Sequence, residues 1–401
     1  MIYNIQVFFD LYEGTILARS VTMKETKFFM REESYVDYSL IFVILFLITF
    51  GLIMLYSTSS YDATLETGDA AYYFKHQLGP TIIGLVGMVV MSFFPYRFLQ
   101  KLSFPIYIAS AVLLLLVIPF GVTINGARRW FRIAGVSVQP AEIAKVAVII
   151  FTATMIIKLQ RNLTTPKGFG VAILFPLILS FMVYRITKNL SSAVIIIGIA
   201  IIMLFVATPG YKRYVITAIA LIAFVAAVIA IIVNSEDSSG MNYRFKRVLA
   251  WLDPNAYASD ESFQTLQALY AIGSGGIFGK GLGESMQKMK LPEAQNDMIF
   301  SIICEELGLF GAIAVMMMFL LLIWRLMIIA NNAPDMYGAL LVIGVMGHIA
   351  IQVILNIAVV TNTIPNTGIT LPFISYGGSA VIIQLAEIGI ALNVARNIGR
   401  S

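Results

Sequence analysis

Ten apolar runs of about 20 residues recur along this chain and restrict its fold more than any other feature. An α-helix needs about 20 apolar residues to cross the hydrocarbon core of a bilayer. Inside that core a helix also satisfies its own backbone N–H and C=O groups, which lipid cannot do. The runs lie at 37–58, 78–95, 103–121, 139–158, 168–185, 192–208, 213–233, 297–324, 336–360 and 378–396. The sequence therefore predicts an all-α integral membrane protein with about ten transmembrane helices.

The composition agrees with a lipid environment. Hydrophobic residues make up 59% of the chain and charged residues only 12%, whereas soluble domains are about 25% charged. We expect one membrane domain over 37–401, preceded by a cytoplasmic tail at 1–36 that either lies along the membrane surface or is disordered. The net charge of +5 does not indicate a nucleic-acid partner, because basic cytoplasmic loops give the same sign. The single cysteine, Cys304, excludes an intrachain disulfide.

Basic residues gather in the loops on one side of the predicted helices. By the positive-inside rule that side is cytoplasmic, and both chain termini lie there. The polar stretches of the other side then face outward, at 59–77, 122–138, 234–296 and 361–377. The longest, 234–296, joins the seventh and eighth predicted helices. Helix connections are usually much shorter, so the sequence predicts that the chemistry takes place on the outer face.

Asp297 stands where the glycine-rich loop ends and the eighth apolar run begins. An ionisable residue at the mouth of a membrane helix is by default a functional hypothesis, because holding it near lipid is costly. One interpretation is a general base whose pKa is tuned by partial burial. The other is an N-cap, in which Asn296 or Asp297 accepts hydrogen bonds from the first N–H groups of the helix. The sequence leaves both interpretations open.

Two further groups of charges have both a functional and a structural interpretation. Arg128 and Arg129 belong to the outer run 125–132, where arginine forks suit phosphate and aromatic residues suit the headgroup region. Interfacial anchoring is the alternative, although arginines that serve as anchors favour the cytoplasmic side. Glu142 and Lys145 are three residues apart on one helix face and are expected to neutralise each other, with substrate contact as the alternative.

Gln352 and Asn356 form a polar stripe on the ninth predicted helix, with His348 one turn earlier. Hydrogen bonding between helices is the default interpretation of such a stripe. His348 is expected to be satisfied by a neighbour rather than to bind metal, and Glu305 and Glu306 also need partners.

The glycine-rich segment 273–281 does not match a nucleotide-binding loop. That loop requires glycine where Ser274 stands and serine or threonine where Gly281 stands. No nucleotide cofactor is therefore expected.

Several longer motifs together resemble the SEDS family of bacterial peptidoglycan glycosyltransferases. They lie at 55–60 (LYSTSS), 125–131 with 139–142 (QPAE), 291–300 and 365–379 (PNTGITLPFISYGGS). The last motif is the longest and the most specific. The residues around 373–376 and 283–288 are more similar to the division and sporulation branch (FtsW and SpoVE) than to the elongation branch (RodA).

The resemblance implies a GT-C-like membrane fold in the bacterial cytoplasmic membrane that polymerises lipid II into glycan strands for division, sporulation or elongation. The implied reaction is inverting, with Asp297 as general base and a divalent cation, Mg²⁺ or Mn²⁺, whose ligands are unknown. Arg128, Arg129, Lys288 or this cation would stabilise the departing pyrophosphate. The implied partners are lipid II, a class B penicillin-binding transpeptidase and other division or elongation proteins. Six residues are expected to contact the substrate: Arg128, Arg129, Lys288, Gln352, Asn356 and Ser375.

The chain departs from the family pattern at two places. Gln295-Asn296 stand where the family usually has His-Thr, so no role can be assigned to that histidine. The loop at 188–191 lacks an acidic residue that the family often has, which removes a candidate metal ligand. Two functions from other classes remain as alternatives, a lipid II flippase and a non-catalytic scaffold of the division machinery.

Overall fold

The computed structural model describes residues 37–124, 127–133, 136–208, 210, 212, 214–219, 223, 243–256 and 262–398. Within this part of the chain, nine helices are long and apolar enough to cross a membrane. They are α2 (Tyr38–Thr67), α3 (Tyr72–Phe93), α4 (Tyr96–Phe120), α5 (Pro140–Leu159), α6 (Pro166–Thr187), α7 (Leu190–Ala207), α11 (Ile299–Asn331), α12 (Met336–Val360) and α13 (Gly378–Arg396). All nine correspond to predicted runs. The tail predicted at 1–36 and most of the helix predicted at 213–233 lie outside the described residues.

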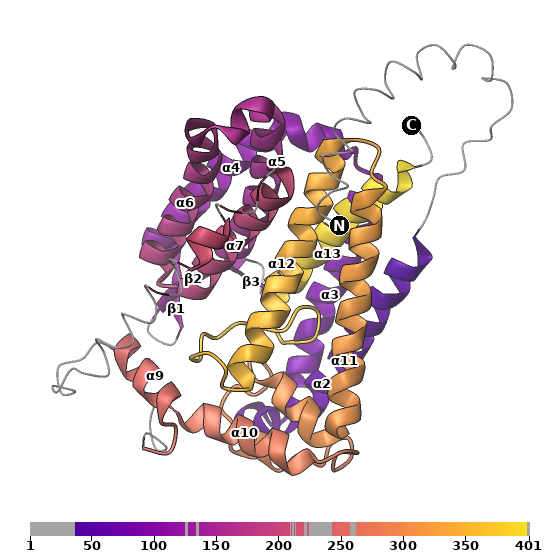
Figure 1. Ribbon diagram of the computed structural model, residues 1–401. Helices are drawn as coiled ribbons and strands as arrows, with labels where there is room; N and C mark the ends of the chain where they lie inside the picture. The colour runs from indigo at the N-terminus through magenta and orange to yellow at the C-terminus, as the bar shows by residue number, and fades with distance from the viewer. Residues whose placement is uncertain are drawn as a thin grey trace, which may run out of the picture.

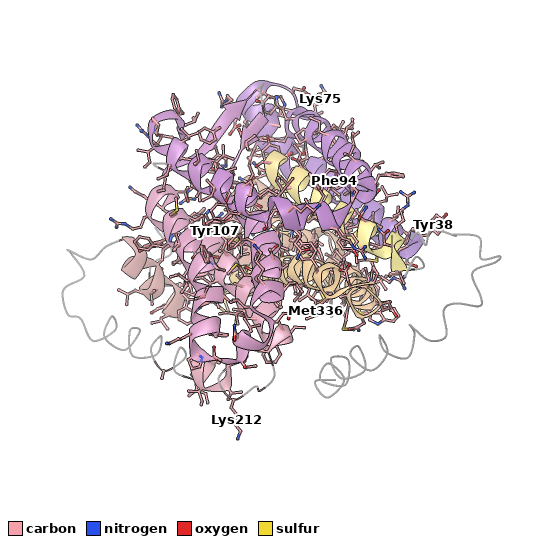
Figure 2. The ribbon with its side chains drawn as sticks, turned by 90° about the horizontal axis from the view of Figure 1, so that it is seen from above. Tyr38, Lys75, Phe94, Tyr107, Lys212 and Met336 are labelled. Carbon is pink, nitrogen blue, oxygen red and sulfur yellow. The ribbon has the colours of Figure 1, made fainter. Side chains whose placement is uncertain are left out.

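The helices form two groups that meet along α12. On one side α4, α5, α6 and α7 pack together, and on the other α2 packs with α3 and α11, α3 packs with α13, and α12 packs with α11 and α13 (Figure 1). The contacts of α12 with α5 and α7 join the two groups. Within the first group Tyr107 of α4, labelled in Figure 2, lies against Phe151 and Phe175, with ring centroids 4.7 and 5.7 Å apart. Its hydroxyl also donates to the carbonyl of Phe175.

Apart from η1 (Gln160–Thr164), which connects α5 to α6, the remaining elements gather at one end of the bundle, which we call the polar-loop end. A small antiparallel sheet with the order β1-β2-β3 follows α4, built from β1 (Val122–Ile124), β2 (Ala127–Ile133) and β3 (Val136–Val138). The helices α9 (Tyr243–Leu252) and α10 (Phe263–Gly275) and the short η2 (Gln287–Met289) precede α11 at the same end (Figure 1). The irregular segment 361–377, hereafter the 361–377 loop, connects α12 to α13 there.

The polar stretch predicted as a loop at 59–77 is mostly helical, so that prediction was wrong. The helix α2 continues to Thr67 and ends at Gly68, whose φ of 74° forms a left-handed cap. Hydroxyl groups in this stretch bond back to the carbonyl four residues earlier, as Thr64 does with Ser60. These local bonds satisfy the polar side chains within a helix. Only a short connection at 68–71 separates α2 from α3.

The eighth predicted run is not one continuous helix. Gly308 interrupts α11 with φ 67° and ψ −163°, a conformation that favours glycine. A Cβ atom at Gly308 would collide with the backbone of Ile277 and Gly279. A short buried helix from Ile299 therefore precedes the break, and the long apolar helix follows it. Asp297 thus lies before the short helix rather than at the mouth of the long one.

Candidate functional site

Asp297 lies at the polar-loop end, where α10, α12 and the 361–377 loop converge. The first residue of the short helix is Ile299, and its N-cap, Met298, makes no side-chain capping bond. Neither Asn296 nor Asp297 therefore caps the helix, which excludes the N-cap interpretation. Gly368, with φ 68°, brings its backbone against the carboxylate, and a Cβ there would lie 3.7 Å from Asp297 Oδ2.

A chain of amide hydrogen bonds leads from α9 to the Asp297 carboxylate. Gln264 on α10 donates to Asp297 Oδ1 at 3.3 Å and to the carbonyl of Pro292 at 3.2 Å. Asn366 in turn donates to Gln264 Oε1 at 2.8 Å. Arg247 on α9 donates to the backbone carbonyl of Asn366 at 3.0 Å. The orientation of the Asp297 carboxylate is therefore linked to two helices and one loop.

The polar stripe of α12 holds the backbone around Asp297. Asn356 donates to the carbonyls of Asp297 and Ile369 at 2.8 and 2.7 Å. Gln352 donates to the carbonyl of Thr370 at 3.1 Å and accepts from Gln384 of α13 at 3.3 Å. The default interpretation of this stripe is therefore confirmed for the Gln352–Gln384 pair, and the other bonds support the 361–377 loop.

The predicted substrate residue Ser375 also supports the 361–377 loop. Its buried hydroxyl accepts the backbone N–H of Leu371 at 2.8 Å. The backbone N–H of Gly377 is accepted by Gln77 of α3 at 3.2 Å. Substrate contacts by Gln352, Asn356 and Ser375 stay predictions. The hydrogen bonds described above make these three side chains positioning residues for the loop that faces Asp297.

Burial raises the pKa of Asp297 from 3.8 to about 6, because the protein around the carboxylate disfavours its charged form. A backbone hydrogen bond opposes this shift, the negative charge of Glu293 adds to it, and Arg247 and Gln264 oppose it. A carboxylate with this pKa is mostly ionised at neutral pH and is more basic than an ordinary aspartate. That combination suits a general base.

Arg128 and Arg129 lie on β2, which packs against α4, α5 and α6. Arg128 donates to the carbonyl of Ile118 at 3.0 Å and to the Thr123 hydroxyl at 3.2 Å. Arg129 donates to the carbonyl of Thr187 at 3.0 Å, at the end of α6. Both guanidinium groups thus bind carbonyls near helix C-termini, where positive charge is favourable. A role in binding pyrophosphate stays a prediction for both residues.

Lys288 belongs to a second buried cluster rather than to the hydrogen-bonded chain at Asp297. Its ammonium donates to the carbonyls of Gly283 and Ser57 at 2.6 and 3.2 Å and lies 3.7 Å from Glu306. The Ser57 hydroxyl donates to both oxygens of Glu306 at 2.7 and 2.8 Å. Lys280 pairs with Glu305 at 2.6 Å. The two glutamates therefore have the partners that the sequence required.

The other buried charges are also paired. Glu142 and Lys145 form an ion pair of 2.7 Å with almost no exposure, as predicted. His348 Nδ1 lies 2.8 Å from Glu387 of α13, and both side chains are fully buried, which confirms that a neighbour binds the histidine. Its Nε2 has no hydrogen-bond partner among the described residues.

Few protein side chains near Asp297 could act as ligands to a divalent cation. Among the described residues, no group of three or more histidine, cysteine, aspartate or glutamate side chains could hold a metal ion. Magnesium, however, is usually bound by one or two carboxylates, with substrate phosphates and waters as the remaining ligands. Asp297 alone meets the lower end of that range, and the charge of the exposed Glu293 acts on it. The site therefore fits a cation that is shared with a phosphate-bearing substrate.

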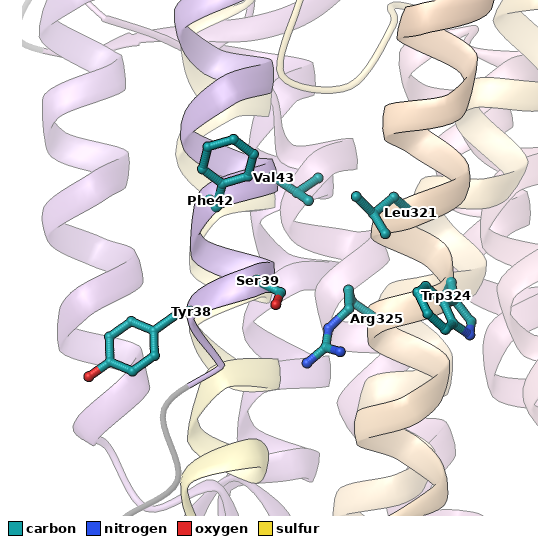
Figure 3. Close-up of a pocket in the computed structure, with 7 residues that line it drawn as sticks. All are labelled: Tyr38, Ser39, Phe42, Val43, Leu321, Trp324 and Arg325. Carbon is teal, nitrogen blue, oxygen red and sulfur yellow. The ribbon is translucent and has the colours of Figure 1, made fainter.

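A pocket of about 390 Å³ lies at the opposite end of the bundle, between α2 and α11. Figure 3 shows its lining, which includes Phe42, Leu321, Trp324 and Arg325. The helix rises about 24 Å between Leu309 and Arg325 at 1.5 Å per residue. Arg325 is also bound to Asp37 at 2.6 Å. The pocket is therefore remote from Asp297 and is not part of the candidate site.

Gln264, Asn366 and Arg247 are the site residues that sequence reasoning did not assign. Asn366 lies in the motif at 365–379, so the motif was a usable signal. Gln264 lies in an otherwise ordinary helical segment, 33 residues before Asp297, and only the fold brings the two together.

Comparison with known proteins shows the family to which this chain belongs. The family model for FtsW, RodA and SpoVE, described as "Cell cycle protein", matches residues 38–399. Stage V sporulation protein E of Bacillus subtilis is 38% identical over 366 residues, which cover 90% of this chain and 97% of the relative. A probable peptidoglycan glycosyltransferase FtsW of Trichlorobacter lovleyi is 36% identical over 366 residues, covering 90% and 93%.

Solved structures agree with these relatives. A chain from a study of polymerization and crosslinking by a peptidoglycan synthase complex superposes with a TM-score of 0.75 and 25% identity, covering 90% of this chain and 98% of that one. Thermus thermophilus RodA gives 0.64 and 26% identity, with 90% and 97% covered. The chain is therefore a multi-pass membrane protein that belongs to the FtsW–RodA–SpoVE family, the SEDS family that its motifs resemble.

Proposed function

We propose that this chain is a peptidoglycan glycosyltransferase that polymerises lipid II, with Asp297 as the general base. The observation that carries the proposal is a partly buried Asp297 carboxylate that accepts from Gln264 of α10, while Asn356 of α12 fixes the Asp297 backbone. Burial raises the pKa of this carboxylate to about 6. The family membership and the relatives named peptidoglycan glycosyltransferase support the reaction class.

In the proposed reaction a hydroxyl of the acceptor sugar attacks the anomeric carbon of the donor. Asp297 accepts the hydroxyl proton as the new C–O bond forms. The bond from the anomeric carbon to the pyrophosphate breaks, and its electron pair leaves with the lipid pyrophosphate. Pyrophosphate departs without being protonated, so the second carboxylic acid of a glycosidase is not needed. One direct displacement inverts the configuration at the anomeric carbon.

The leaving pyrophosphate needs positive charge nearby. Arg247 is the cation whose charge acts on Asp297 and whose guanidinium supports Asn366. We therefore add Arg247 to Arg128, Arg129 and Lys288 as a candidate for this role. A divalent cation held by Asp297 would supply further neutralisation of the pyrophosphate when bound.

The proposed orientation places the polar-loop end on the extracytoplasmic side and both termini in the cytoplasm. The basic residues of the opposite end support it, since Arg97 and Lys101 lie in the first turns of α4 and Arg325 lies in the last part of α11. Lipid II would then reach Asp297 from the outer leaflet. A class B penicillin-binding transpeptidase is the proposed partner, and the structural likeness to a peptidoglycan synthase complex supports it.

The test is glycan-strand formation from fluorescent lipid II by the purified protein in vesicles. Wild type, Asp297→Asn and Asp253→Asn would be compared, with and without a class B partner, and with Mg²⁺, Mn²⁺ or a chelator. Asp253 is an exposed carboxylate outside the site and serves as the matched control. The proposal predicts polymer from wild type and Asp253→Asn, and none from Asp297→Asn. Absence of polymer from wild type with the partner and either cation would overturn it, and lipid II translocation by Asp297→Asn would then favour a flippase.

A further inference from the structure

The segment 276–290, hereafter the 276–290 loop, exposes large apolar side chains and pairs two of its lysines with buried glutamates of α11. Phe278 is 79% exposed and Met286 is 61% exposed, and Ile277 and Leu282 are also exposed. Lys280 and Lys288 point the other way, toward Glu305 and Glu306. A loop surrounded by water normally keeps such large apolar groups inside, whereas here they are exposed together with Glu284 and Lys290.

The backbone of the 276–290 loop is hydrogen-bonded to the break in α11. Lys280 and Gly281 donate their N–H groups to the carbonyls of Glu305 and Glu306, both at 2.9 Å. In return Leu309 donates to the carbonyl of Gly276 at 3.0 Å, and Phe310 donates to that of Ile277 at 3.2 Å. Internally satisfied backbone groups are what a non-helical segment needs in order to lie at membrane depth.

The exposed face of the 276–290 loop is continuous with an apolar stripe on the long part of α11. The stripe consists of exposed side chains at alternating spacings of three and four residues: Phe310, Ile313, Met317, Leu320 and Trp324. This spacing puts them on one face of a membrane-spanning helix, the face available to lipid. Phe278 stacks on Phe310, with ring centroids 5.5 Å apart and an interplanar angle of 19°. The loop thus extends the stripe past the end of the helix.

We propose that the 276–290 loop inserts into the lipid leaflet at the polar-loop end. Phe278, Leu282 and Met286 enter the boundary between headgroups and acyl chains, and the exposed Glu284 stays at the water side. The inserted loop fixes the depth of the short helix that follows Asp297, because the two are joined by the bonds of Glu305 and Glu306. A lipid-linked substrate would then meet the carboxylate without leaving its leaflet.

Site-directed spin labelling of the full chain tests this proposal without relying on enzyme activity. Single variants Phe278→Cys, Met286→Cys, Glu284→Cys and Ile313→Cys would carry a nitroxide in vesicles of phosphatidylethanolamine and phosphatidylglycerol. The unsubstituted chain controls for Cys304, which is buried. Collision rates with oxygen, which partitions into lipid, are compared with those of a water-soluble nickel chelate. Ile313 provides the lipid reference, and Glu284 provides a water reference within the same loop.

The proposal predicts that labels at 278 and 286 collide preferentially with oxygen, as at 313, and that the label at 284 collides preferentially with nickel. Preferential nickel collisions at 278 and 286 would overturn it, because the loop would then lie in water. Labels protected from both reagents would also overturn it, because a second copy of the chain would then cover the face. Loss of polymerisation activity would not change the collision rates with oxygen or with nickel. Failure of the insertion proposal is therefore distinguishable from failure of the proposed function.

Discussion

Asn356 holds the backbone of Asp297, not its carboxylate: its side-chain amide donates to the Asp297 carbonyl at 2.8 Å and to the Ile369 carbonyl at 2.7 Å. One buried residue of α12 therefore fixes two segments that are 72 positions apart, the start of α11 and the 361–377 loop. The Asp297 carboxylate remains available to a substrate, and the Asn356 amide fixes its position through the backbone.

Replacing Asn356 with alanine is expected to lower kcat by about 10- to 100-fold, since small misplacements of a catalytic group can cost that much. Two backbone carbonyls lose their donor, so some stability is lost as well. Asn393→Ala is the matched control, because this buried amide donates to Ser92 at 2.7 Å, at the opposite end of the bundle. Thermal unfolding and polymerisation would be measured for both. Equal loss of activity in both variants would contradict a positioning role for Asn356.

Replacing Gln264 with leucine is expected to raise the pKa of Asp297. The Gln264 hydrogen bond to Oδ1 favours the ionised carboxylate, so removing it favours the protonated form. The rising limb of the pH–rate profile should therefore move to higher pH, with a smaller loss of rate at pH 8 than at pH 6. A uniform loss of rate at every pH would show that Gln264 has only a structural role.

Asp297→Asn is expected to stabilise the fold at neutral pH. The pKa of Asp297 is about 6 in the folded chain, compared with 3.8 for an ordinary aspartate. The native state therefore binds the proton more tightly, and ionisation removes stability as pH rises from about 4 to about 6. Asparagine avoids this penalty, so unfolding at pH 7 should require about 3 kcal/mol more, with no difference below about pH 4. Unfolding temperatures across this range check the prediction, and a difference that does not depend on pH would contradict it.

Gly308→Ala is expected to destabilise the protein by several kcal/mol, roughly 3 or more, because strain and overpacking add at this position. Gly308 has φ 67°, and a Cβ would meet the backbone of Ile277 and Gly279. Gly273→Ala in α10 is the control, because nothing lies within 4 Å of its Cβ position. That change should be neutral or mildly stabilising, since alanine is the better helix former. Similar unfolding temperatures for the two variants would contradict the account of the α11 break.

The apolar runs predicted the nine described membrane helices well, because crossing a bilayer requires a length and a composition that the sequence displays directly. The pattern could not predict the extension of α2 through 59–67, where polar side chains bond locally to their own helix. It also could not predict the break at Gly308, because the immediate neighbours of that glycine, Leu307 and Leu309, are apolar.

The sequence could predict individual residues of the site but not their arrangement. Asp297 is recognisable because a lone carboxylate beside an apolar run is costly, and Asn356 because it is polar within a helix. Their arrangement depends on contacts between distant segments, such as Asn366 with Gln264, which are 102 positions apart. Lys288 looked like a candidate for the substrate because a sequence does not show that Glu306 and Ser57 already bind it.

The measurement that tests the central claim most directly is the pH dependence of lipid II polymerisation by wild-type protein with its class B partner. If Asp297 is the base, kcat/KM should rise about tenfold per pH unit below its pKa and level off above about pH 6. Residual activity of Asp297→Asn should lack this limb. A wild-type rate that stays constant from about pH 5 to pH 8, or a limb that survives in Asp297→Asn, would show that another group accepts the proton.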